Sequence, residues 1–322
     1  MNAVRRLRRA PRLTIALTAA VAVSIAAAVA WGATPAIQTI TPNTADQMTN
    51  IDVARQQAKN YYGAPLAASG ATGTWADPLN LQSNYAHEAA SVASKGENWL
   101  HARSKVHNRA IVLDVDDTTL TTWNYELFSN WDFNGGTNAN FVGLTTSGTP
   151  PVTTFTGNMF PATPGMVDLV NQAKAMGYAV FWITGRGDSQ HQATIANLQS
   201  DAAAGLPDIT SVNYSGFTVP EVDAGYAAPT PLDTGHGGFT DGLFTKPPVG
   251  SYHAYLNKPE FCADAIAAKA SCPTIQYKSG TRAYIESQGY DIVGDFGDQF
   301  SDLTGGFTDK TFKMPNPNYF LP

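Results

Sequence analysis

Three short apolar segments, separated by stretches with helical periodicity, restrict the fold of this chain more than any other feature. They lie at residues 110–114, 178–184 and 291–294. Short apolar runs of this kind are typical of strands that are buried on both faces of a sheet. Because strands that alternate with helices form parallel sheets, we expect an α/β fold with a doubly wound parallel sheet. Helices are predicted over residues 51–61, 82–105, 166–176, 189–203, 260–270 and 279–288.

Two stretches of the chain have no clear period and are rich in turn-forming residues. Residues 119–160 contain many Gly, Thr, Asn and aromatic residues, and residues 204–258 are rich in Gly and Pro. We expect the first stretch to be a small cap-like insertion and the second to be a long loop insertion. The main domain is therefore predicted over residues 81–322, after a linker and an N-terminal helix over residues 34–80.

The N-terminal segment has the three parts of a secretory signal peptide. Residues 1–12 carry five Arg and no acid, residues 13–31 are almost entirely apolar, and small residues follow in an Ala28-Val29-Ala30 pattern. We therefore predict a signal peptide over residues 1–33 and a secreted or cell-envelope protein without a stable membrane partner. The alternative is an uncleaved anchor, because the apolar run nearly reaches the length that spans a bilayer.

The charge of the chain argues against nucleic-acid binding. There are 20 Lys and Arg against 26 Asp and Glu, and no basic run occurs beyond the extreme N-terminus. A basic stripe or patch is the usual electrostatic signature of nucleic-acid binding, so we expect no nucleic-acid surface.

The chain has two cysteines, Cys262 and Cys272. In an exported protein an isolated pair of this kind is expected to form one disulfide that closes a short loop. The alternative, a metal-binding or redox-active pair, lacks both the CxxC spacing and nearby ligands.

An acidic cluster follows the first apolar segment, where residues 114–120 read Asp-Val-Asp-Asp-Thr-Thr-Leu. Open α/β sheets bind their ligands at the carboxyl ends of the strands. In an extended segment Asp114 and Asp116 project to the same side, so one carboxylate can attack while the other transfers protons. We expect Asp117 to be a solvated or structural acid.

Polar groups also follow the other apolar segments. Thr184 and Gly185 offer a hydroxyl and backbone N–H groups at an expected helix start, which suits phosphate oxygens. Lys278 offers a positive charge at another expected helix start. Asp298 and Asp302 follow the third segment, and hard oxygen ligands of this kind suit Mg²⁺.

Taken in order, these motifs resemble those of the haloacid dehalogenase (HAD) superfamily. Within it they are most similar to the secreted acid phosphatases of subfamily IIIB, which are related to plant acid phosphatases and vegetative storage proteins. The resemblance is carried by Asp114, Asp116 and Thr118, by Thr184 in Ile-Thr-Gly-Arg, by Lys278 in Tyr-Lys-Ser-Gly-Thr-Arg, by Asp298 and Asp302 in Gly-Asp-Gln-Phe-Ser-Asp-Leu, and by the tail Phe312–Tyr319. It covers residues 80–320 in patches and implies a HAD-like Rossmannoid core with a small cap.

The resemblance also implies a catalytic mechanism. Asp114 would attack phosphorus and form an aspartyl phosphate. Asp116 would protonate the leaving alcohol and then deprotonate the hydrolytic water. The expected activity is a Mg²⁺-dependent acid phosphatase that acts on a small phosphomonoester.

The remaining site residues receive binding roles from the same resemblance. Mg²⁺ would be held by the Asp114 carboxylate, the backbone carbonyl of Asp116 and Asp298, with Asp302 as a further ligand or as a group that orients the others. Phosphoryl oxygens would be bound by Thr184, Gly185 and Lys278.

Two other functions remain open. A phosphotransferase of the same fold would pass the phosphoryl group to an alcohol in place of water. A storage or binding protein would keep only a relict metal site, although the presence of Asp114 favours an enzyme. The second acid, Asp116, favours phosphoryl chemistry over dehalogenation, which needs no leaving-group acid.

The sequence leaves the roles of two features open. His191 stands where the subfamily often has a basic residue, so it would serve either the phosphate side or helix packing. An aromatic set would either cover the leaving group or form the core of the cap; its members are Trp123, Tyr125, Phe128, Trp131 and Phe133.

Overall fold

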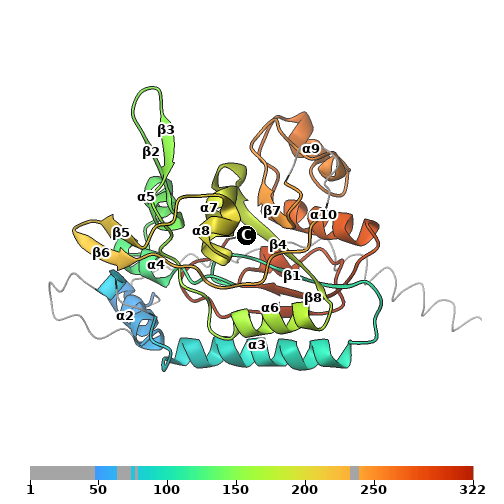
Figure 1. Ribbon diagram of the computed structural model, residues 1–322, viewed down its shortest axis with the longest axis horizontal. Coiled ribbons are helices and arrows are strands. Elements are labelled where there is room, and N and C mark those ends of the chain that lie inside the picture. The colour runs from blue at the N-terminus through green and yellow to red at the C-terminus, as the bar shows by residue number, and fades with distance from the viewer. Residues whose placement is uncertain (1–47, 64–73, 77–78, 233–238, 322) are drawn as a thin grey trace, which may run out of the picture. The chain divides into compact units, whose positions relative to one another are not determined.

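Five parallel strands form the central sheet of the protein, in the order β7-β4-β1-β8-β9 (Figure 1). Their bounds, in that order, are Leu243–Lys246, Ala179–Gly187, Arg109–Leu113, Asp291–Gly297 and Thr311–Lys313. The computed structural model describes residues 48–63, 74–76, 79–232 and 239–321, all within one compact unit of the chain, Pro42–Pro322. The predicted parallel α/β sheet is confirmed.

Helices cover both faces of this sheet because successive strand residues point to opposite sides. On β1, Ile111 packs in a core that includes apolar residues of α3 (Asn84–Ala102) and α6 (Met166–Ala175). Its neighbour Val112 packs in a second core with residues of α10 (Thr274–Ser287). Because the strands are buried on both sides, their sequences read as continuous apolar runs.

Outside residues 119–160, the remaining described helical elements are short, apart from α2. They are α2 (Ile51–Tyr61), η2 (Thr74–Ala76), η3 (Asp188–Gln190), α7 (His191–Leu198), α8 (Asp201–Ala204), η4 (Ala254–Leu256), α9 (Ala263–Ala267) and α11 (Phe300–Leu303). The helix predicted over 189–203 is therefore divided among three elements. The helix predicted over 279–288 begins earlier, at Thr274, so the placement of Lys278 at a helix start was wrong. Apolar periodicity missed this start because Lys278 and other polar residues occupy buried positions of α10.

The two irregular stretches contain regular elements. Residues 119–160 include α4 (Trp123–Ser129), α5 (Gly135–Val142) and the hairpin of β2 (Leu144–Ser147) and β3 (Val152–Phe155). Residues 204–258 include the hairpin of β5 (Ser211–Tyr214) and β6 (Phe217–Pro220), and also β7. The prediction of a loop insertion over 204–258 missed β7, an edge strand of the sheet, because four residues are too few to reveal a period.

The cysteine prediction is confirmed, since Cys262 and Cys272 form a disulfide with a Cα–Cα distance of 5.3 Å. The predicted signal peptide, residues 1–33, lies outside the described residues. Within the described part, no helix combines the length and apolar composition needed to cross a bilayer.

Candidate active site

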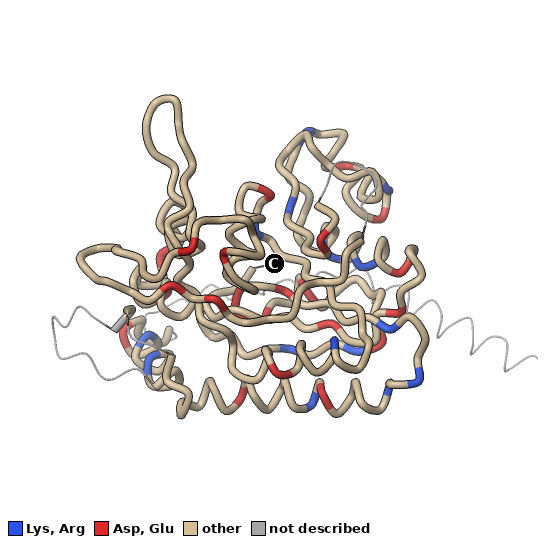
Figure 2. Tube along the Cα trace, in the orientation of Figure 1, with Lys and Arg blue, Asp and Glu red and all other residues tan. Residues whose placement is uncertain are grey.

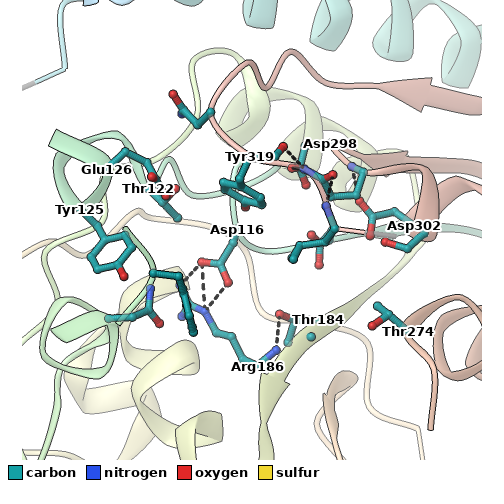
Figure 3. Close-up of a pocket in the computed structure, with 18 of the residues that line it drawn as sticks. Asp116, Thr122, Tyr125, Glu126, Thr184, Arg186, Thr274, Asp298, Asp302 and Tyr319 are labelled. Carbon is teal, nitrogen blue, oxygen red and sulfur yellow. Dashed lines mark hydrogen bonds and ion pairs between the residues drawn. The ribbon is translucent and has the colours of Figure 1, made fainter. Parts of the chain in front are cut away.

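A pocket of about 380 Å³ opens at the carboxyl ends of β1, β4 and β8 (Figure 3). All seven residues that the sequence singled out for catalysis, phosphate binding or metal binding line it: Asp114, Asp116, Thr184, Gly185, Lys278, Asp298 and Asp302. Parallel strands direct their carboxyl ends to one edge of a sheet, which explains how residues so far apart in the chain meet.

Asp114 lies directly beyond β1 and is held against a buried cation. Its backbone N–H donates to the carbonyl of Phe296 at 2.9 Å, which continues the pairing of β1 with β8. The Nζ of Lys278 donates to Asp114 Oδ1 and to Asp302 Oδ1, both at 2.6 Å. All three side chains are at most 9% exposed, so one ammonium group sits between two carboxylates with little access to water.

Burial and the ion pair have opposite effects on the pKa values of Asp114 and Lys278. Burial raises the pKa of the Asp114 carboxyl well above its ordinary value, although the nearby Lys278 opposes the shift. Burial by itself would lower the pKa of Lys278, but Asp114 and Asp302 raise it above its ordinary value. Lys278 therefore stays protonated and partly compensates the buried negative charge.

Asp298 gives the cluster a third carboxylate. It accepts hydrogen bonds from Thr118 Oγ1 at 3.2 Å, Gln299 Nε2 at 2.6 Å and Asn316 Nδ2 at 2.7 Å. Burial, and then the charge of Asp302, raise the pKa of Asp298 to about 8.

The three carboxylates are arranged as a set of cation ligands. Carboxylate oxygens of Asp114, Asp298 and Asp302 lie within 4.8 Å of one another. Three hard oxygen donors against one ammonium group fit a divalent cation, which would relieve their mutual repulsion.

Asp116 points away from this cluster and toward β4. Arg186 Nη2 donates to Asp116 Oδ1 at 2.6 Å, and Arg186 Nε donates to Asp116 Oδ2 at 3.0 Å, as the dashed lines in Figure 3 show. Arg186 is itself fixed by a hydrogen bond from Nη1 to Thr194 Oγ1 at 3.1 Å. Arg186 is the last residue of the Ile-Thr-Gly-Arg motif, and the motif by itself indicates no role for its side chain.

The end of β4 offers a hydroxyl and an open backbone. Thr184 is buried, and its Oγ1 accepts a hydrogen bond from the backbone N–H of Arg186 at 3.1 Å. At Gly185, no heavy atom beyond the residue itself and its two chain neighbours lies within 4 Å of the place where a Cβ would stand, so its backbone is accessible from the pocket. This edge suits the oxygens of an anion.

Asp117 is a structural acid and is not solvated. It is fully buried with a φ of +51°, and it accepts hydrogen bonds from Thr122 Oγ1 at 2.6 Å and from Thr122 N at 3.0 Å. These bonds fix the turn that separates Asp116 from α4.

The aromatic residues after the first motif divide between the two predicted roles. The ring centroids of Trp123 and Tyr62 lie 4.0 Å apart in a stacked pair, and those of Phe128 and Phe141 lie 5.5 Å apart. Trp123 and Phe128 therefore belong to the core. Trp131 and Phe133 line the pocket, while Tyr125 lines the pocket and is also packed in the core.

Glu126 is a pocket residue that sequence reasoning missed. It lies on α4 beside Tyr125, on the side of the pocket opposite Asp298 and Asp302 (Figure 3). Its side chain is buried, and its carboxylate has no hydrogen-bond or ion-pair partner among the described residues. Burial raises the pKa of Glu126 to about 7. No spacing rule marks an isolated Glu of this kind.

His191 serves helix packing, one of the two roles left open. Its ring stacks on Phe239 with a centroid distance of 3.4 Å, and its Nε2 lies 2.7 Å from Asp241 Oδ2. Its Nδ1 lies 3.3 Å from Thr245 Oγ1 on β7. His191 therefore ties α7 to the edge strand and does not line the pocket.

A family model matches most of this chain. The model of the HAD superfamily, subfamily IIIB (acid phosphatase), matches residues 40–215 and 264–322. The unmatched stretch overlaps the second irregular segment.

Curated relatives match over short segments. The chain is 44% identical to vegetative storage protein 2 of Arabidopsis thaliana over 48 residues, which are 15% of this chain and 18% of that protein. It is 46% identical to acid phosphatase 1 of Solanum lycopersicum over 46 residues, 14% of this chain and 18% of that protein. The matches thus span less than a fifth of the length of these relatives.

A solved structure, the class C acid phosphatase from Bacillus anthracis, is similar over 73% of this chain and 80% of that chain. The sequence identity is 18% and the TM-score is 0.41.

Proposed function

The chain belongs to the HAD superfamily, subfamily IIIB (acid phosphatase), and on that premise we propose that it hydrolyses small phosphomonoesters. One observation carries the proposal. Asp114 follows β1, Thr184 lies on β4 and Lys278 lies on α10, and all three line one pocket beside a cluster of carboxylates. A nucleophile, a fixed cation and an anion-binding backbone are the groups that phosphoryl transfer requires.

Asp114 is the proposed nucleophile. Its carboxylate attacks phosphorus, the bond from phosphorus to the ester oxygen breaks, and an aspartyl phosphate forms. Water then attacks the phosphoryl group, which releases phosphate and restores the Asp114 carboxylate. Lys278, at 2.6 Å from Asp114 Oδ1, holds the nucleophile in place and offsets the repulsion between two anions.

Asp116 is the proposed proton donor and acceptor. It gives a proton to the leaving alcohol and later takes one from the attacking water. In Figure 3 it lies between Asp298 and Asp302 on one side and Tyr125 and Glu126 on the other. A substrate whose phosphoryl group faces the carboxylate cluster would present its ester oxygen near Asp116.

Mg²⁺ is the proposed cation of the site. Asp114, Asp298 and the backbone carbonyl of Asp116 would hold it, with Asp302 as a ligand or as a group that orients the others. When bound, Mg²⁺ would neutralise phosphoryl oxygens and the carboxylates around them. Thr184, Gly185 and Lys278 would bind the remaining phosphoryl oxygens.

The leaving group is proposed to rest against the aromatic wall of Tyr125, Trp131 and Phe133.

We further propose that the protein is exported, with residues 1–33 as its signal. The disulfide between Cys262 and Cys272 supports an oxidising destination.

The decisive experiment is hydrolysis of p-nitrophenyl phosphate by the purified protein and by Asp114→Asn. We expect the substitution to reduce kcat by at least about 10³-fold, because the amide cannot form the covalent intermediate. Asp264→Asn is the matched control, since Asp264 is exposed on α9 and lies outside the pocket. Turnover that survives in Asp114→Asn would contradict the mechanism. A folded wild-type protein without turnover would favour the storage role.

Removal of the metal tests the carboxylate cluster. EDTA should abolish turnover, and added Mg²⁺ should restore it. Asp298→Asn should require a higher Mg²⁺ concentration for half-maximal activity, because it removes one charged ligand. Full activity in EDTA would exclude a role for a divalent cation in the reaction.

A further inference from the structure

A second carboxylate cluster lies outside the pocket, in a part of the chain without Lys or Arg. Residues 187–245 contain seven Asp and Glu but no Lys or Arg, and residues 110–173 also lack Lys and Arg. Figure 2 shows this segment with acidic positions and no basic ones around α8 and the hairpin of β5 and β6.

The cluster consists of Asp201, at the start of α8, and Glu221 and Asp223, directly after β6. One carboxylate oxygen from each lies within 4.8 Å of the other two. Ligands on opposite sides of a Ca²⁺ ion are about 4.6–5.2 Å apart, since each Ca²⁺–O distance is about 2.3–2.6 Å. None of the three residues lines the catalytic pocket.

Asp201 has a buried acceptor without a hydrogen-bond partner in the part of the chain that the structure describes. The residue is only 4% exposed. Its Oδ2 accepts a hydrogen bond from the backbone N–H of Ile209 at 3.0 Å, but its Oδ1 is buried and has no hydrogen-bond partner among the described residues. A buried carboxylate oxygen without a donor is costly unless another positive group meets it.

Asn158 adds a second unsatisfied oxygen from another part of the chain. It is fully buried, and both its backbone N–H and its Nδ2 donate to Glu221 Oε1 at 3.3 Å. Its side-chain amide therefore lies against the cluster, while its Oδ1 has no partner in the described part of the chain. The backbone N–H of Val222 donates to the Asn158 carbonyl at 3.1 Å, which keeps the two segments together.

Among the described residues, no Lys, Arg or His forms an ion pair with these three carboxylates, and Asp223 shares a side-chain hydrogen bond with Glu221. Burial, and the charges of Asp201 and Asp223, raise the pKa of Glu221 to about 7, although hydrogen bonds from Asn158 oppose the shift. Burial and then Asp223 and Asp208 raise the pKa of Asp201. A bound cation would stabilise these carboxylates, because its charge would offset their mutual repulsion.

We propose that Asp201, Glu221 and Asp223, assisted by the Asn158 side-chain oxygen, bind a Ca²⁺ ion that stabilises the fold. Carboxylates mixed with a neutral amide oxygen are typical Ca²⁺ ligands, and Ca²⁺ accepts a less regular set of ligands than Mg²⁺, which requires a near-ideal octahedron. The ion would fasten α8 to the end of the β5–β6 hairpin. That hairpin packs on the cap segment, where Tyr214 lies 5.5 Å from Phe141. The site is independent of the proposed phosphatase reaction.

The test is thermal unfolding of the EDTA-treated protein with and without 1 mM Ca²⁺. We expect Ca²⁺ to raise the Tm of the wild-type protein by about 5 °C, as for a ligand well above its Kd. Asp201→Asn and Glu221→Gln should lose this increase while remaining at least as stable as the wild type in EDTA, because each removes repulsion. Asp223→Asn, at an exposed position, should also lose it and serves if a buried variant does not fold.

Two controls separate this site from the pocket and from bulk charge. Asp208→Asn removes an exposed neighbouring acid that is not part of the cluster, so it should keep the Ca²⁺ increase. Asp298→Asn removes a carboxylate of the catalytic cluster and should also keep the Ca²⁺-dependent increase in Tm. No increase in the wild type would overturn the proposal. An increase that is lost in Asp298→Asn but kept in Asp201→Asn would also overturn it, because Ca²⁺ would then act at the pocket.

Discussion

At the scale of single residues, the orientation of Asp116 depends on Arg186. The guanidinium holds the carboxylate by hydrogen bonds from Nη2 and Nε, and Thr194 fixes the guanidinium in turn. We expect Arg186→Gln to lower kcat by about 10- to 100-fold, because a misplaced proton donor loses part of the usual benefit of acid–base catalysis. Arg186→Lys should recover only part of the loss, since Lys cannot make the two-pronged contact.

A double-mutant cycle with p-nitrophenyl phosphate as substrate distinguishes positioning from a general structural effect. If Arg186 acts through Asp116, Arg186→Gln should change kcat by less than about threefold in an Asp116→Asn background. An undiminished effect in that background would show that Arg186 contributes in another way, such as direct contact with the substrate.

At the scale of elements, the disulfide closes the loop just before the helix that carries Lys278. Cys272 lies two residues before the start of α10. Replacing both cysteines with Ser should lower the free energy of unfolding by about 3 kcal/mol, measured by urea denaturation. We expect kcat at 25 °C to change by less than about twofold, because Arg282 also anchors α10.

That second anchor is an ion pair and a set of hydrogen bonds. Arg282 lies 3.1 Å from Asp295 on β8 and donates to the carbonyls of Asp302, Thr304 and Gly306. A loss of activity without a loss of stability in the Cys→Ser protein would show that the disulfide itself positions Lys278.

At the scale of the whole molecule, buried carboxyls make stability depend on pH. Burial is the first cause that raises the pKa of Asp117, Glu126 and Glu221 to about 7 and of Asp295 to about 6. Between about pH 4 and these values the folded state binds more protons than the unfolded state, so stability falls as pH rises. Each extra proton bound by the folded state lowers the free energy of unfolding by about 1.4 kcal/mol for each unit that the pH rises.

We therefore expect the metal-free protein to be more stable at pH 5 than at pH 8, as measured by urea denaturation in EDTA. Glu126→Gln should flatten the part of this dependence between about pH 4.5 and pH 7, because it removes one raised carboxyl. A stability that stays constant or rises across this range would contradict the prediction.

The sequence by itself predicted three of the five central strands, most helices and seven residues that line the pocket. Apolar runs such as residues 110–114 predict buried strands, because a strand that is buried on both faces has apolar side chains at successive positions. The motif residues lie together because parallel strands place their carboxyl ends at one edge. The disulfide followed from the presence of two cysteines at a short spacing.

Only the tertiary structure decided the contacts that join distant segments. Strand β7 is too short to show a period, and its place depends on pairing with β4. The contact of Arg186 with Asp116 and the contact of Asp201 with Glu221 depend on which distant segments meet in space. The same is true of the Glu126 carboxylate, which has no partner among the described residues. Sequence patterns report local periodicity, whereas the energy of a buried charge depends on its neighbours in three dimensions.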